Sequence, residues 1–204
     1  MNAMERFPKN RMKVTILGDS RVGKTCLMLR YLYDSFDIDP RILYIEFRNK
    51  TVDVSGVKVM LQILDTDSNK RFRPRITSSL RNFAGIIIVF DLTSKSSFDT
   101  VQYWLQQVHE HAGENVDIVL VGNKVDLAES RVIDHETASS LAQTFGAMYV
   151  ECSVKTRYNV NLVFNSLASK WAKHVPVQQE EPLRLESETF YQVPCYGKDT
   201  CSLF

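Results

Sequence analysis

The feature that most constrains this 204-residue chain is a glycine-rich loop, residues 18–25, with the sequence GDSRVGKT. Glycine, four free positions and then Gly-Lys-Thr form the P-loop pattern. The apolar run 14–17 before it predicts a buried strand, and residues 26–32 after it predict a helix. Such a strand–loop–helix unit directs backbone N–H groups at one point, where phosphate oxygens bind. A chance glycine turn beside a lysine does not account for eight residues in this context.

The composition excludes several classes of protein. A net charge of +1 gives no reason to expect a nucleic-acid partner. No stretch approaches the ~18 apolar residues that span a bilayer, and residues 1–13 lack the apolar segment of a signal peptide. The four cysteines, Cys26, Cys152, Cys195 and Cys201, match no zinc or disulfide spacing, so we expect reduced thiols in the cytosol.

Strand and helix patterns alternate along the chain. Apolar residues alternate on both sides of Gly56, which predicts an antiparallel hairpin. Continuous apolar runs predict buried strands, and apolar residues at helical spacing predict helices between them. The strands are expected at residues 85–91, 118–121 and 148–150, and the helices near 98–108, 138–145 and 160–171. The order predicts an α/β fold with a mainly parallel sheet, one antiparallel edge strand and helices on both faces.

Three segments are predicted to lack regular structure. Residues 36–49 contain Asp39-Pro40, which disfavours helix. Residues 66–79 are polar and arginine-rich, and we expect a loop with solvated arginines there. Residues 175–204 lose the helical period and gain proline and glutamate, so we expect a domain at 11–174 and a flexible tail at 175–204.

Polar residues stand where the predicted strands end, which is where ligands bind in open parallel sheets. Asp65 ends the second hairpin strand, and a carboxylate facing a P-loop can hold Mg²⁺. Asp126, in the turn Asn-Lys-Val-Asp, can accept two hydrogen bonds from the edge of guanine. The backbone N–H groups of residues 153–155 follow the last strand and can donate to the same base.

These motifs resemble those of the Ras superfamily of small GTPases, and most closely its Rab branch. The resemblance covers about residues 13–171 and includes Leu-Gln-Ile-Leu-Asp-Thr, Arg-Phe-Arg and Gly-Asn-Lys-Val-Asp-Leu. It implies the P-loop small GTPase fold, GTP and GDP as ligands with Mg²⁺, and two switch loops at about 36–47 and 65–79. The nucleotide-binding residues that it implies are Gly18, Ser20, Arg21, Val22, Gly23, Lys24, Thr25, Cys26, Phe36, Ser68, Asn123, Lys124, Asp126, Ser153, Val154 and Lys155. It further implies Thr25 and Asp65 as Mg²⁺ ligands and Lys24 and Asn69 as catalytic positions.

Several switch residues depart from the family pattern. No threonine lies between Thr25 and Thr51, where the family has one on Mg²⁺. Ser68 and Asn69 replace the family's glycine and water-orienting glutamine, and Asp67 adds a negative charge beside them. Arg21 replaces the glycine usual in the P-loop. We expect slow intrinsic hydrolysis and weak discrimination between GTP and GDP.

The sequence ends in Cys201-Ser-Leu-Phe, a Cys-a-a-X pattern that favours geranylgeranyl. Cys195 is either a second lipid site or a free thiol. One lipid holds a protein on a membrane only marginally, and this tail lacks the paired terminal cysteines frequent in the Rab branch. We expect a lipid-anchored protein on the cytosolic face of an intracellular membrane.

Two classes of function remain. The first is a Rab-like GTPase that regulates vesicle trafficking, with effector and regulatory proteins bound through its switch loops. The second is a nucleotide-bound scaffold that binds partners without hydrolysis. An adenine-nucleotide kinase is a distant third, because Asp126 and the loop at Lys155 favour guanine.

Overall fold

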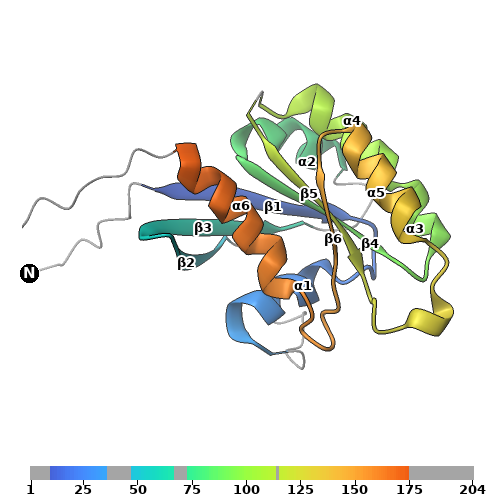
Figure 1. Ribbon diagram of the computed structural model, residues 1–204. Helices are drawn as coiled ribbons and strands as arrows, with labels where there is room; N and C mark the ends of the chain where they lie inside the picture. The colour runs from blue at the N-terminus through green and yellow to red at the C-terminus, as the bar shows by residue number, and fades with distance from the viewer. Residues whose placement is uncertain (1–9, 36–46, 67–72, 114, 175–204) are drawn as a thin grey trace, which may run out of the picture.

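A computed structural model describes residues 10–35, 47–66, 73–113 and 115–174. Its six-stranded sheet has the strand order β2-β3-β1-β4-β5-β6 (Figure 1). The strands are β1 (Arg11–Gly18), β2 (Arg48–Val54), β3 (Val57–Asp65), β4 (Gly85–Asp91), β5 (Asp117–Asn123) and β6 (Met148–Glu151). Neighbouring strands are parallel except β2 and β3, which form the antiparallel hairpin at one edge. The predicted sheet is confirmed.

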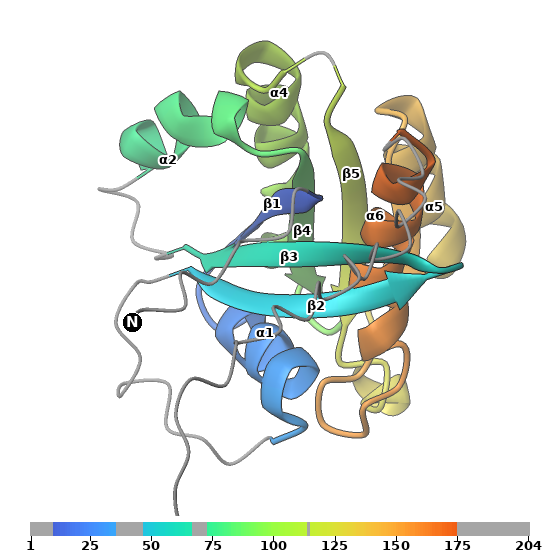
Figure 2. The same ribbon diagram turned by 90° about the vertical axis from the view of Figure 1, so that its left-hand side faces the viewer.

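Helices cover both faces of the sheet, as predicted. They are α1 (Lys24–Tyr33), α2 (Arg73–Ser79), α3 (Lys95–Asp99), α4 (Val101–His111), α5 (His135–Thr144) and α6 (Val160–His174), with short 3-10 turns η3 (Leu80–Asn82) and η4 (Ala128–Ser130). Apolar residues of α1 and α6 pack on one face, and those of α2, α3, α4 and α5 on the other. Figure 2 views the sheet from its β2 edge, with α1 on one side and α2 and α4 on the opposite side.

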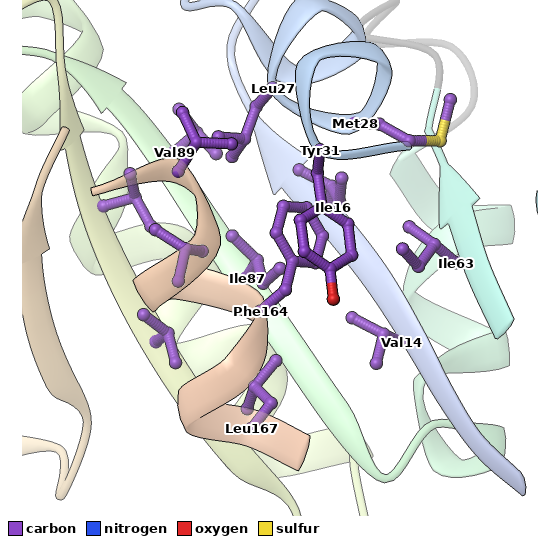
Figure 3. Close-up of a cluster of buried hydrophobic side chains, with 14 of the residues drawn as sticks. Val14, Ile16, Leu27, Met28, Tyr31, Ile63, Ile87, Val89, Phe164 and Leu167 are labelled. Atoms are coloured by element: carbon purple, nitrogen blue, oxygen red, sulfur yellow. The ribbon is translucent and has the colours of Figure 1, made fainter. Parts of the chain in front are cut away.

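Two clusters of buried hydrophobic side chains, one on each face of the sheet, explain why most of the strand sequences are so apolar. Every residue of β4 is buried, because this central strand is covered on both faces. On the α1 and α6 face, the rings of Tyr31 and Phe164 stack with centroids 4.0 Å apart, and aliphatic side chains of the strands surround them (Figure 3). Burial raises the pKa of Tyr31 to about 12, and its hydroxyl donates to Asn165 Oδ1 at 3.2 Å.

Two predicted boundaries were wrong. Residues 73–79 form helix α2, although a loop was expected across 66–79. Their sequence lacks the apolar spacing that predicts a helix, because Thr77 is the only buried residue of α2. Ile76 packs against the second cluster from a half-buried position. Pro74 fits the first turn, where its missing N–H is not needed. The irregular segment predicted at 36–49 also ends early, since β2 begins at Arg48.

Two further findings concern the predicted tail and the length of the helices. The predicted tail, residues 175–204, lies outside the described residues. Among the residues that the structure does describe, no helix combines the length and the apolar character needed to cross a membrane.

Candidate nucleotide-binding site

Most of the described residues that the sequence analysis singles out lie near the carboxyl ends of the parallel strands. Strands β1, β3, β4, β5 and β6 all run in the same direction, so their carboxyl ends lie together. The residues at these ends are Gly18, Asp65, Asp91, Asn123 and Glu151. The fold therefore collects side chains and loops from both halves of the chain into one site.

Two glycines shape the predicted phosphate-binding loop, residues 18–25. Gly18 has φ +138°, and a Cβ there would lie 2.2 Å from the carbonyl oxygen of Val89. Gly23 has φ +100°, and its Cβ would lie 2.4 Å from Nδ2 of Asn123. Both positions combine a backbone conformation that L side chains rarely adopt with no room for a side chain. Glycine is therefore required at the two ends of the loop.

Lys24 lies inside the loop and is buried. Its ammonium donates hydrogen bonds to the carbonyl oxygens of Gly18, at 3.0 Å, and Asp19, at 2.7 Å. These bonds hold the loop in a ring around a positive charge. A phosphate oxygen on the inside of that ring would meet both the charge and the N-terminus of α1.

Thr25 and Asp65 are joined by a short hydrogen bond. The Thr25 hydroxyl donates to Oδ2 of Asp65 at 2.5 Å. The pair brings a hydroxyl oxygen and a carboxylate oxygen to one point at the start of α1. Oxygen donors of these two kinds are ligands that Mg²⁺ accepts together with water and phosphate oxygens. The donor set therefore fits the metal site expected from the sequence.

Asn123 connects three parts of the site and is buried. Its Nδ2 donates to the carbonyl oxygen of Val22 at 2.8 Å. Its Oδ1 accepts from the backbone N–H of Val154 at 3.3 Å and from the thiol of Cys152 at 3.6 Å. One side chain at the end of β5 thus fixes the phosphate-binding loop relative to the loop after β6.

A pocket of about 270 Å³ opens beside this asparagine. It is lined by Arg21, Gly23, Cys26, Asn123, Lys124, Asp126, Leu127, Val154 and Lys155. Asp126 is held in place because its Oδ1 accepts from the hydroxyl of Ser153 at 2.6 Å. The Ser153 oxygen in turn accepts from the N–H of Thr156 at 3.0 Å. An aspartate and a constrained backbone loop therefore line the same pocket, as the guanine recognition predicted from the sequence requires.

The Lys124 ammonium is paired with a residue that sequence reasoning missed. It lies 2.6 Å from Oδ2 of Asp91, and Asp91 stands beside Asn123 in the register of β4 and β5. Burial acts to raise the pKa of Asp91, but hydrogen bonds from Lys124 and Thr93 outweigh it and lower that pKa below its ordinary value. The available signal was an aspartate at the end of a fully apolar strand.

Cys26 lines the pocket as a protonated thiol. Its pKa is raised by burial and by the nearby Asp65 carboxylate. A thiol with a raised pKa is a poor nucleophile. Cys26 therefore contributes shape to the site, and its chemistry differs from that of a reactive cysteine.

Comparison with known proteins identifies this arrangement. The sequence profile of the Ras family matches residues 13–173. The chain belongs to the Ras family. This GTPase is 41% identical to the Ras-related protein Rab-26 of Bos taurus over 172 residues, which are 83% of this chain and 67% of the relative. It is 40% identical to the human Ras-related protein Rab-37, covering 83% and 77% of the two chains. It is also 41% identical to the Ras-related protein SEC4 of Saccharomyces cerevisiae, covering 77% and 73%.

These relatives make the chain a Rab-like small GTPase, and most of its predicted site residues converge. The phosphate-binding loop, Asp65, Asn123, Lys124, Asp126 and the loop after β6 all lie at the same sheet edge. Ser20 is exposed and does not line the pocket. Five predicted residues lie outside the described part of the chain: Phe36, Ser68, Asn69, Cys195 and Cys201.

The prediction that the arginines of 66–79 are solvated was wrong for Arg73. Its side chain is only 18% exposed, and its Nη2 lies 2.8 Å from Oδ1 of Asp19 in the phosphate-binding loop. The guanidinium also lies over the rings of Tyr103 and Trp104, 5.1 and 5.2 Å from their centroids. No local pattern could predict this, because the partners are far apart in the sequence.

Proposed function

We propose that this Rab-like GTPase binds GTP and GDP with Mg²⁺, with the phosphates in the ring around Lys24 and the base in the pocket at Asp126. The contact between Thr25 and Asp65 is the observation that carries the metal part of the proposal. When bound, Mg²⁺ would supply positive charge to the terminal phosphate oxygens. Thr25 and Asp65 would hold it, and Asn123 would keep the phosphate and base halves of the site in register.

Slow hydrolysis is the second part of the proposal. Positioning is nearly all that the protein contributes to phosphoryl transfer. Asn69 is one methylene shorter than the glutamine that orients water in the family, and Ser68 replaces the adjacent glycine. A shorter side chain on a stiffer backbone holds water less well at the phosphate. Nucleotide binding and weak turnover therefore go together in this chain.

The decisive experiment measures the nucleotide content of purified protein and then single-turnover GTP hydrolysis with Mg²⁺. Wild type is compared with Asn69→Gln, and Asp65→Asn serves as the control that weakens the metal site. We expect bound guanine nucleotide, slow hydrolysis in wild type and faster hydrolysis in Asn69→Gln. Hydrolysis by wild type at a rate ordinary for the family would contradict the slow-turnover proposal.

The same measurement separates the GTPase from a scaffold that does not cycle. The sequence Asp67-Ser68-Asn69 favours the scaffold, because three residues in a row differ from the family pattern. Bound guanine nucleotide that neither wild type nor Asn69→Gln hydrolyses would establish that second function. Absence of bound nucleotide would contradict both.

A role in vesicle trafficking on the cytosolic face of an intracellular membrane is the third part. It rests on the Rab-like sequence and on the Cys-a-a-X pattern at Cys201. Effector and regulatory proteins would bind through the two switch loops. In cells, Cys201→Ser should move the protein from the membrane fraction to the cytosol, and Cys195→Ser tests for a second lipid. Equal partition of Cys201→Ser and wild type would contradict the anchor.

A further inference from the structure

Arg30 of α1 holds the loop after β6, residues 153–156, and does not itself line the pocket. Its Nε donates to the carbonyl oxygen of Val154 at 2.9 Å, and its Nη2 donates to that of Lys155 at 2.7 Å. The Arg30 side chain is only 15% exposed. Two successive carbonyl groups of one loop are therefore fixed by one planar guanidinium, whose fork of donors is rigid.

Fixing these carbonyls also orients the N–H groups of the loop. In a trans peptide the C=O and the following N–H point in opposite directions. Because Arg30 draws the Val154 carbonyl outward, the N–H of Lys155 points the other way, and Lys155 lines the pocket. The neighbouring N–H groups are used: that of Val154 bonds to Asn123, and that of Thr156 bonds to Ser153.

The Lys155 N–H is thus the donor that remains for a ligand. Within the described part of the chain it makes no hydrogen bond. Asp126 can take the N1–H and the 2-amino group of guanine, and the next polar atom on that base is the acceptor O6. Lys155 and Asp126 line the same pocket.

Asp34 holds the Arg30 side chain in place and is itself bound by Arg157. Its Nη1 donates to the backbone carbonyl of Asp34 at 2.9 Å, and the Asp34 carboxylate lies 3.8 Å from the same nitrogen. Arg157 binds the other oxygen of that carboxylate at 2.6 Å. Arg157 touches Asp34 but none of the loop carbonyls held by Arg30, so it provides a matched control.

We propose that Arg30 is a positioning residue for base selection: it aims the Lys155 N–H at the 6-carbonyl of the purine. This inference rests on the proposed binding of guanine nucleotides. Separate groups then recognise the two sides of guanine. Asp126 accepts hydrogen bonds from the N1–H and the 2-amino group, and the loop backbone that Arg30 holds in place donates to O6.

The test uses full-length, nucleotide-free protein and four diphosphates. GDP carries the N1–H, the 2-amino group and O6, and IDP lacks only the 2-amino group. The diphosphate of 2-aminopurine riboside lacks O6 and, with it, the N1–H, so the effect of Arg30 is taken from how its ratio to GDP changes between variants. ADP, which has a 6-amino group in place of O6, tests the preference for guanine itself. Dissociation constants are measured for wild type, Arg30→Met, Arg30→Lys and Arg157→Met. The preference for GDP over the 2-aminopurine nucleotide should fall about 10-fold in Arg30→Met, since one directed hydrogen bond is lost. The preference for GDP over IDP should stay within about 2-fold of wild type in every variant.

The outcomes separate the inference from the proposed function. A wild type that does not prefer GDP over ADP contradicts the proposed function and the inference with it. Suppose that wild type prefers GDP over ADP, but that Arg30→Met keeps the wild-type preference for GDP over the 2-aminopurine nucleotide. That result overturns the inference alone. An equal fall of both preferences in Arg30→Met also overturns it, because Arg30 would then only support the fold. If Arg30→Met does not fold, Arg30→Lys decides, with an expected fall of about 3-fold.

Discussion

The guanidinium of Arg73 lies 2.8 Å from the carboxylate of Asp19, so helix α2 is tied to the phosphate-binding loop. The tie is supported from α4, where Tyr103 and Trp104 lie beneath the same guanidinium. Both charges are largely buried, with side chains 18% and 26% exposed. A contact of this kind connects the predicted phosphate-binding loop to α2, which lies within the predicted second switch loop, residues 65–79.

We expect Arg73→Met to lower the free energy of unfolding by about 1–2 kcal/mol, since a partly buried ion pair and two cation–π contacts are lost. Urea unfolding measures this, and hydrogen exchange should show faster exchange of the α2 amides. Asp19→Asn and the double variant complete a cycle, in which we expect a coupling of about 1 kcal/mol. Additive effects of the two substitutions would show that the contact has no energetic role.

Arg21 is strained, because it adopts φ +65° in the phosphate-binding loop. The left-handed conformation costs a non-glycine residue about 1–2 kcal/mol, so a glycine at this position should stabilise the folded state. The greater conformational freedom of glycine in the unfolded chain offsets part of that stabilisation. We expect Arg21→Gly to raise the free energy of unfolding by about 0.5–1 kcal/mol relative to Arg21→Ala. Urea unfolding of the nucleotide-free proteins measures the difference.

The alanine variant separates the charge of Arg21 from its backbone. It keeps the Cβ and the strain while removing the guanidinium from the pocket lining. If the charge assists phosphate binding, GDP release should be faster in both variants and by the same factor. An Arg21→Gly protein no more stable than Arg21→Ala would contradict the strain argument.

Glu151, at the end of β6, should make stability depend on pH. Burial acts to raise its pKa, but hydrogen bonds from Arg131, Tyr149 and His135 together lower it below the ordinary value of 4.5. Because the folded-state pKa is the lower one, this carboxylate stabilises the fold fully above about pH 4.5. That contribution is lost as the pH falls through the folded-state pKa.

We expect Glu151→Gln to lower the free energy of unfolding at pH 7 by about 2 kcal/mol, as for loss of charge-assisted hydrogen bonds. The difference from wild type should shrink when urea unfolding is repeated at successively lower pH. Glu129→Gln, at an exposed position in η4, is the control and should follow wild type at every pH. A difference that stays constant from pH 7 to pH 3 would rule out this role for Glu151.

The sequence predicted the elements whose burial is uniform. The run Gly85–Asp91 is apolar throughout because β4 is covered on both faces, so its pattern identifies a central strand. Helix α2 has little such pattern, because Thr77 is its one buried residue. Its helical conformation depends on contacts with α4, made in part through Arg73 over Tyr103 and Trp104, and such contacts leave no periodic signal.

The site divides in the same way. Residues that end strands, such as Asp65 and Asn123, were predictable because parallel strands bring their carboxyl ends together. Arg30 was not, since it lies in the last turn of an ordinary amphipathic helix and its contact with Val154 spans 124 residues of sequence. Position within a motif identifies the groups that meet the ligand, whereas groups that hold those motifs in place are visible only in three dimensions.

The side chain of Asn123 also sets an order of events during synthesis. It joins Val22, near the start of the chain, to Val154, which the ribosome adds more than a hundred residues later. Tyr31, on the helix that follows the phosphate-binding loop, likewise stacks on Phe164 of the final described helix. A nascent chain that stops before β6 lacks both partners and cannot complete the pocket. The pocket is therefore complete only after the residues that follow β6 have been synthesised.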